Sequence, residues 1–265
     1  MTSTRATLAS MPSGPAIRLQ LLGAPRLLRD GQALHVRSRK AMAILAVIAL
    51  EAGVSRVRLA GWLWPEVDAA GARRNLRREL FRLRKLGVPI AEAADGALAV
   101  DPAFAVDALH QSREDAVPAS DAPAFEGLDG VGSEELDAWL RCWREQLARR
   151  RLQLLDEAAN ECEQHGDLAA ALALQERRWA GDLSSESAAL AVIRLRAALG
   201  DPVGALHDYQ RHADALRQEL DLAPSESARS LALELRAVVR ASAGTAAPQP
   251  AGPLPSRRRG RTIPR

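Results

Sequence analysis

The stretch that decides the fold occupies residues 59–87 and reads LAGWLWPEVDAAGARRNLRRELFRLRKLG. Pro65 ends a short helical segment, because proline cannot continue a helix and restricts the residue before it. After an acidic loop, residues from about 69 to 86 have helical periodicity, and Gly87 and Pro89 stop them. The pattern predicts two helices joined by a short turn.

The second of these helices has two unlike faces. At 100° per residue, one face carries an apolar stripe, Ala72, Leu76, Leu80 and Leu83. The opposite face carries Arg74, Arg78, Phe81 and Lys85, flanked by Arg77 and Arg82. Glu79, the helix's one acid, falls near the apolar stripe, so we expect the bases to have no acidic partner. Duplex DNA would neutralise such a face, and its major groove accepts an α-helix.

Arginine dominates the basic face, and arginine can bond guanine O6 and N7 in a bidentate manner. We expect Arg74 and Arg78, in the N-terminal half of the exposed face, to contact base edges. Arg77, Arg82 and Lys85 are expected to contact phosphates, and Phe81 belongs to the same predicted DNA-contacting face. The alternative is a solvated basic helix or one that binds an acidic protein.

Two further groups lie near this helix in sequence. Arg37, Arg39 and Lys40 surround the start of a helix capped by Ser38, where free N–H groups favour phosphate. We include all three bases in the predicted DNA-binding set. Trp62 and Trp64 are expected to anchor the turn in the core, with direct DNA contact as the alternative.

The surrounding sequence completes a small α+β domain over residues 17–110. Residues 17–36 have the pattern of short strands with a hairpin turn, and residues 38–51 that of an apolar helix. Residues 90–101 predict a second hairpin that turns at Asp95-Gly96. Strands, three helices and a terminal hairpin are the order of a winged helix-turn-helix.

The second half is predicted to be all-α, so the chain is mainly α. A polar linker at 111–132 precedes helical sequence at 133–240. Gly166-Asp167 and Gly200-Asp201 lie 34 residues apart, the period of tetratricopeptide helix-turn-helix repeats. Residues 1–16 and 241–265 lack apolar periodicity and are expected to be disordered tails.

Charge divides the chain in the same way. Residues 17–102 hold 15 basic and 8 acidic residues, a net charge of +7, whereas residues 103–240 hold 15 basic and 25 acidic residues, a net charge of −10. Such an asymmetry suggests a polyanion-binding part joined to a part that avoids polyanions.

These segments resemble a known family. Residues 59–87 are similar to helix 2, the loop and the recognition helix of the OmpR-type winged helices in SARP (antibiotic regulatory protein) activators. The sequences FEGLDGVGSEELDAWLRCWREQL (125–147) and GDPVGALHDYQRHADALRQELDLAPSESARSLALELR (200–236) resemble the bacterial transcriptional activator domain (BTAD), which is tetratricopeptide-like. The resemblance covers about 17–238.

The resemblance implies a sequence-specific DNA-binding regulator, an activator that binds promoters, with the helical domain serving dimerisation and contact with RNA polymerase. The sequence departs from the family in a short region between the wing and Phe125. It also lacks the phosphate-binding loop of the ATPase present in larger relatives, so the chain is either a small regulator or the front of a longer one.

Other classes of function find less support. The five histidines lack metal-ligand spacing, no nucleophile or dinucleotide motif is present, and we expect no enzyme activity, cofactor or metal. Absence of a signal segment or long apolar run predicts a cytoplasmic protein. One alternative is a protein-interaction scaffold, in which the repeats bind a partner and the basic helix docks an acidic protein. Another is a ligand-sensing groove lined by Trp139, Trp143 and Trp179, although core packing of these side chains is favoured.

Overall fold

The computed structural model describes residues 17–51, 53–109 and 122–245. They form two compact units, of which the first ends at Ala158 and the second begins at Ala159. The predicted tails lie outside the described residues, apart from 241–245, which extend the last helix. Residues 111–121 of the predicted linker also lie outside them.

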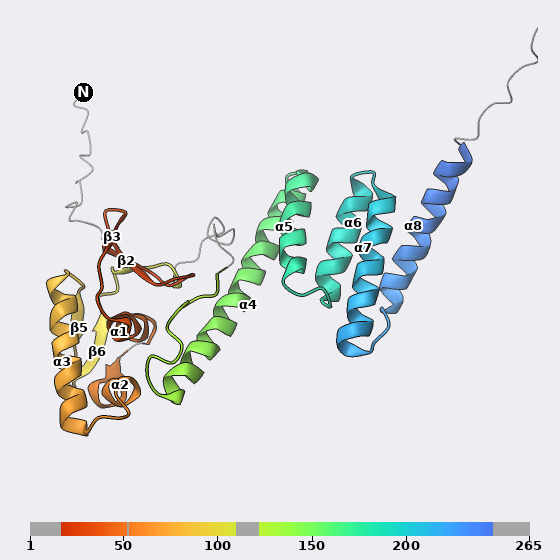
Figure 1. Cartoon of the computed structure of the whole chain (residues 1–265). Helices are drawn as coiled ribbons and strands as arrows, with labels where there is room; N and C mark the ends of the chain where they lie inside the picture. The colour runs from red at the N-terminus through yellow and green to blue at the C-terminus, as the bar shows by residue number, and fades with distance from the viewer. Residues whose placement is uncertain (1–16, 52, 110–121, 246–265) are drawn as a thin grey trace, which may run out of the picture. The chain divides into compact units, whose positions relative to one another are not determined.

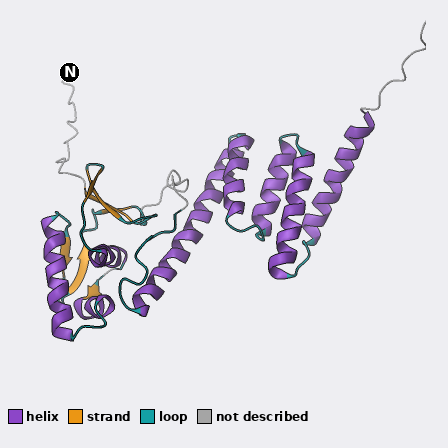
Figure 2. Ribbon diagram, in the orientation of Figure 1, coloured by secondary structure: helices purple, strands orange, loops and turns teal. Residues whose placement is uncertain are grey.

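Unit 1, which ends at Ala158, contains two small sheets and three helices that precede a long fourth. Figure 1 shows their arrangement within this unit. Its elements are β1 (Ile17–Gln20), β2 (Arg26–Arg29), β3 (Gln32–Leu34), α1 (Arg39–Leu50), β4 (Val54–Ser55), α2 (Arg56–Leu63), α3 (Ala69–Lys85), β5 (Ile90–Glu92), β6 (Ala97–Val100), β7 (Ala105–Val106) and the first part of α4 (Glu134–Gln164). One sheet has the order β3-β2-β1-β7 and the other β4-β6-β5. Figure 2 shows the strands of both sheets close to the helices of this unit. The predicted winged helix-turn-helix order is confirmed.

Helix α1 forms the centre of unit 1. Ser38 caps it as predicted, accepting a hydrogen bond from the backbone of Ala41, and every residue from 41 to 50 is buried. A helix that is apolar all round must be covered on all sides. Helices α2 and α3 and the two sheets therefore pack around one core, which holds the other helices in place.

Two strands of unit 1 were not predicted. β4 pairs with β6, and β7 pairs with β1 in parallel, Arg18 opposite Ala105 and Leu19 opposite Val106. Asp107 secures the second pairing, because its carboxylate accepts from the backbone N–H of Leu21 at 2.8 Å and of Leu22 at 3.1 Å. Strands of two residues carry too little periodicity to be recognised in sequence.

Residues 122–132 and the start of α4 pack onto the winged helix-turn-helix. Phe125 is fully buried, and its N–H donates to the carbonyl of Leu21 at 2.9 Å. Gly132 approaches α2 so closely that a Cβ would lie 2.3 Å from the carbonyl oxygen of Trp62. The indole of Trp139 in α4 donates to Glu51 at 2.6 Å. The core of unit 1 thus extends beyond the wing into α4.

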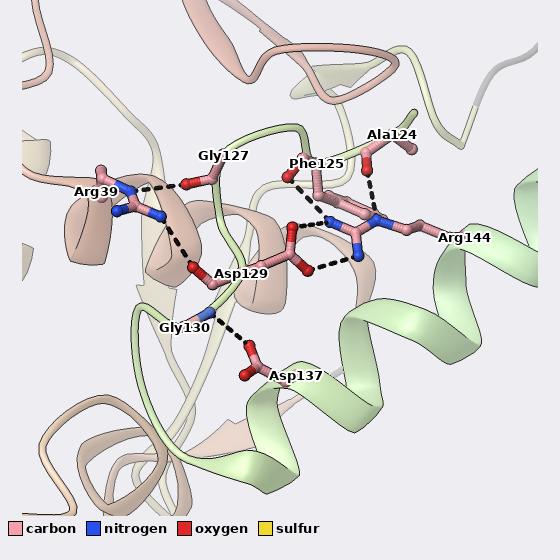
Figure 3. Close-up of polar contacts among 8 residues, drawn as sticks. All are labelled: Arg39, Ala124, Phe125, Gly127, Asp129, Gly130, Asp137 and Arg144. Carbon is pink, nitrogen blue, oxygen red and sulfur yellow. Dashed lines mark hydrogen bonds and ion pairs between the residues drawn. The ribbon is translucent and has the colours of Figure 1, made fainter. Parts of the chain in front are cut away.

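Two arginines clamp this segment from opposite sides (Figure 3). Arg144 of α4 bonds both carboxylate oxygens of Asp129, at 2.7 and 2.8 Å, and also the carbonyls of Ala124 and Phe125. Arg39 of α1 donates to the carbonyls of Gly127 and Asp129. The hydrogen bonds from Arg144 hold the pKa of the Asp129 carboxyl below its ordinary value.

Unit 2 consists of helices throughout its described residues. After the end of α4 come α5 (Leu168–Ala180), α6 (Glu186–Ala198), α7 (Pro202–Ala215), a π-helical turn (Leu216–Leu220) and α8 (Glu226–Thr245). Both Gly-Asp pairs of the repeat work alike: the glycine has a positive φ, +79° and +85°, and the aspartate then caps the next helix. The repeat found in sequence is therefore a stop-and-start signal between helices.

An ion network around the buried Asp208 carboxylate connects three of these helices. The Arg196 guanidinium in α6 bonds Asp208 of α7 at 2.7 Å and also bonds Glu176 of α5. The Asp208 side chain is only 4% exposed. Burial would lower the pKa of Arg196, but the charges of Asp208, Glu176 and Asp201 raise it above its ordinary value.

Candidate nucleic-acid interface

Helix α3 (Ala69–Lys85) is the predicted recognition helix, and its ends are well defined. Asp68 caps it by accepting from the backbone N–H of Gly71 at 2.9 Å. Gly71 is required by the tight turn, because a Cβ there would lie 2.6 Å from both Asp68 and Val67 side chains. Gly87, with φ +84°, follows its last turn. Observed and predicted bounds agree to within one residue.

Only a narrow stripe of α3 is buried against the rest of unit 1. Ala72, Leu76, Leu80 and Leu83 are all at most 3% exposed, as the periodicity predicts. The exposed residues on the remaining surface include seven bases: Arg73, Arg74, Arg77, Arg78, Arg82, Arg84 and Lys85. The helix therefore presents a broad cationic surface, which we call the basic face.

Arg73 and Arg84 are exposed on α3 as well, although the predicted DNA-contacting set does not include them. On a 100° wheel they lie beside the basic face, on the flank opposite Arg82. Since the buried stripe is narrow, both flanks are exposed. The two arginines are visible in the sequence. To predict that they are exposed, one must also know how much of the helix circumference the core covers.

Glu79 corrects the expectation that the bases lack an acidic partner. Its carboxylate is buried, yet its Oε1 accepts from Arg82 Nη1 at 2.7 Å and lies 3.8 Å from Arg78 Nε. Arg78 Nη2 in addition donates to Asn75 at 3.3 Å. Long side chains let a residue near the apolar stripe reach the flank of the basic face, so position on a wheel did not reveal the contact.

Phe81 and Lys85 are neighbours on the exposed face. The Lys85 ammonium lies 4.8 Å from the centre of the Phe81 ring, within cation–π range. Phe81 is 56% exposed, which is unusual for a phenylalanine. The exposed ring keeps an apolar contact surface in the middle of a charged face.

The predicted bases at the start of α1 differ from one another in the structure. Arg37 is exposed. Arg39 is engaged by the backbone carbonyls described above, and Lys40 donates to the carbonyl of Leu63 and lies 3.5 Å from Glu66. The donors of Arg39 and Lys40 thus fasten parts of unit 1 together, a role that sequence alone did not indicate.

The tryptophans near the turn have the structural role that was favoured. Trp64 is buried and Trp62 half-buried, with its ring 6.4 Å from that of Trp139. The Arg58 guanidinium lies 4.2 Å from the centre of the Trp62 ring. Trp139 and Trp179 are also buried, at 8% and 2% exposure. Core packing is confirmed for these side chains.

The wing, which is the β5–β6 hairpin at residues 90–101, carries a net negative charge. It contains Glu92, Asp95 and Asp101 and no lysine or arginine. Glu92 is bonded by both Arg56 Nε and Nη2, at 2.8 and 2.6 Å, which ties the wing to the start of α2. An acidic wing repels phosphates, so the basic face of α3 is the part of unit 1 best suited to a polyanion.

The described residues show neither a metal site nor a membrane-spanning helix. They contain no group of three or more histidine, cysteine, aspartate or glutamate side chains placed to hold a metal ion. No helix within 17–51, 53–109 and 122–245 is both long and apolar enough to cross a membrane.

Comparison with known proteins agrees with this architecture. No protein-family model matches the chain, and no curated protein matches it in sequence. Among solved structures, EmbR of Mycobacterium tuberculosis, in complex with a low-affinity phosphopeptide, matches with a TM-score of 0.65 and 19% identity. The match covers 88% of this chain and 70% of that chain. It agrees with the fold expected from the resemblance: the chain is similar in fold to EmbR, with a mixed α/β N-terminal region followed by an all-helical region.

Proposed function

We propose that the protein is a sequence-specific DNA-binding transcriptional regulator whose helix α3 enters the major groove. The observation that carries the proposal is the basic face of α3, which has seven exposed bases. The helix itself is held in place by its N-terminal cap and by the packing of its buried residues. Exposed like charges on one helix destabilise it, and phosphates relieve that cost. Within this face, Arg74 and Arg78 are assigned to base edges, and Arg77, Arg82 and Lys85 to phosphates.

The EmbR-like fold supports the same proposal, since in that fold a mixed α/β region precedes a helical region along the chain. The acidic wing limits which part of unit 1 we propose to contact DNA. DNA contact falls to α3, and the wing stays off the phosphates. We leave Arg39 and Lys40 out of the contact, because their donors serve the fold.

The helical region is proposed to contact protein. Residues 103–240 carry a net charge of −10, which opposes binding to DNA. Dimerisation on DNA and contact with RNA polymerase, with activation as the outcome, are the roles assigned to it. The function proposed is binding rather than catalysis.

Fluorescence anisotropy with labelled duplexes tests the proposal. The wild-type chain is measured on a duplex enriched from a random library and on a scrambled duplex, over a range of salt concentrations. Neutralising about five phosphates should give a slope of log K against log salt near −4 to −5. The Arg74→Ala/Arg78→Ala variant should lose the preference for the enriched duplex.

The matched control removes the same charge elsewhere in unit 1. Arg141 and Arg149 are exposed on α4, so Arg141→Ala/Arg149→Ala should bind almost as the wild type does. If the two double variants bind the duplexes with the same affinity, the basic face does not bind DNA. The same conclusion follows if the affinity for every duplex is independent of salt concentration. A protein scaffold would then be the better account.

A further inference from the structure

Glu79 is an unusual residue for the buried side of a recognition helix. Its side chain is only 7% exposed, on the same side of α3 as Leu76, Leu80 and Leu83. A leucine there would bury apolar surface, whereas a buried ion pair is seldom worth more than apolar residues of similar volume. Stability of the helix alone does not explain a carboxylate at this position.

The contacts of Glu79 all run toward the basic face. Arg82 Nη1 donates to Oε1 at 2.7 Å, and Arg78 Nε lies 3.8 Å from the same oxygen. Both arginines remain more than half exposed, at 60% and 52% for their side chains. The Arg82 guanidinium is held by this hydrogen bond, whereas Arg78 lies at ion-pair distance from Glu79 and donates its hydrogen bond to Asn75. Both guanidinium groups keep other N–H groups toward solvent.

The remaining bases of α3 differ from this pair. Arg73, Arg74 and Arg77 make no hydrogen bond or ion pair with another described residue, the Arg84 charge acts on Glu92 of the wing, and the Lys85 ammonium lies over the Phe81 ring. An arginine without a side-chain partner loses more rotamer entropy when a base fixes it than an arginine that is already oriented. A bidentate contact with a base requires a guanidinium in one orientation.

We infer that Glu79 is a positioning residue for sequence recognition, which holds Arg78 and Arg82 ready for bidentate contacts with guanine. The inference rests on the proposed function and deepens it. It moves Arg82 from the phosphate-contacting group to the base-contacting group. Arg78 and Arg82 lie four residues, about one helical turn, apart. They therefore lie on the same face of α3 and would enter the same groove of the DNA.

The carboxylate also lowers the local positive charge. Its removal should leave attraction to phosphates intact or increase it, while the arginines lose their fixed orientation. Specific binding should thus weaken, while non-specific binding stays equal or strengthens. A residue that only stabilises the helix would weaken both.

The experiment uses the full chain and two substitutions, Glu79→Gln and Arg82→Lys. Each variant is taken through selection from a random duplex library beside the wild type, and its affinity is measured on the wild-type site and on a scrambled duplex. Glu79→Gln replaces the ion pair by a weaker hydrogen bond from the charged guanidinium to a neutral amide oxygen, so preference for the selected site should fall about fivefold. Affinity for the scrambled duplex should stay equal or rise up to about twofold.

The two substitutions should act on one contact. Arg82→Lys keeps the charge but lacks the planar guanidinium that Glu79 orients, so it should relax the same guanine position. The double variant should be no worse than the more severe single one. Glu126→Gln is the control, since it removes the same charge from an exposed side chain outside α3.

Several results would overturn the inference. One is a Glu79→Gln variant that enriches the same site with unchanged preference, which leaves the proposed function standing. Another is equal weakening on both duplexes with a lower melting temperature, which indicates a structural role. If wild type enriches no site and binds no duplex, the proposed function fails and this inference with it.

Discussion

The substitution Phe125→Ala tests whether the core of unit 1 extends past the wing. Phe125 is 0% exposed, its ring centre lies 6.1 Å from that of Trp139, and it comes from a segment that follows the winged helix-turn-helix in sequence. Removing a buried phenylalanine ring costs about 3–5 kcal/mol. Its φ of +59° is strained for alanine as well, so the difference reports the loss of the ring.

The cost should be visible in the melting temperature of unit 1. For a unit of this size, each kcal/mol lowers the melting temperature by roughly 2–4 °C, so we expect a fall on the order of 10 °C. Tryptophan fluorescence is a suitable probe, because four of the five tryptophans, Trp62, Trp64, Trp139 and Trp143, belong to unit 1.

Phe81→Ala is the matched control, with the same side chain removed from an exposed position. Phe81 is 56% exposed on the basic face, so its loss should change the melting temperature by less than about 2 °C. It should instead weaken binding to duplex DNA. A Phe125→Ala variant that melts within about 2 °C of the wild type would refute the extended core.

Two further predictions concern the ion pairs of the two units. Because Arg144 lowers the pKa of Asp129, this carboxylate contributes stability above its ordinary pKa and loses it on protonation, below about pH 4. Asp129→Asn should therefore melt lower than wild type at pH 7 and converge with it toward pH 3; a constant difference at both pH values would contradict the assignment. In unit 2, Arg196→Met leaves the buried Asp208 carboxylate without its closest partner, at a cost of about 3 kcal/mol. Urea unfolding followed by circular dichroism should show that loss, and should show almost none for the exposed Arg194→Met; equal effects would argue against the network.

Features set by local chemistry could be predicted from the sequence. The bounds of α3 follow from Asp68 and Gly87, and the cap of α1 from Ser38. The repeated Gly-Asp pairs mark helix ends because glycine tolerates a positive φ and aspartate caps the following helix. These signals lie within a few residues of the structure they determine.

Features set by distant contacts could not be predicted. Arg39 meets carbonyls about 90 residues away, and β7 pairs with β1 across most of unit 1. Nothing in the pattern around Arg39 distinguishes a structural arginine from a phosphate-binding one. The reach of Glu79 to Arg82 was local, but it depends on rotamers, which a helical wheel does not show.

Chemical probing of the protein–DNA complex with dimethyl sulfate tests most directly that α3 enters the major groove. The reagent methylates guanine N7, which faces the major groove, and adenine N3, which faces the minor groove. A basic helix in the major groove with an acidic wing held off the DNA predicts protection of guanine N7 in the selected site and unchanged reactivity of adenine N3. Protection of adenine N3 with guanine N7 fully reactive would contradict the account.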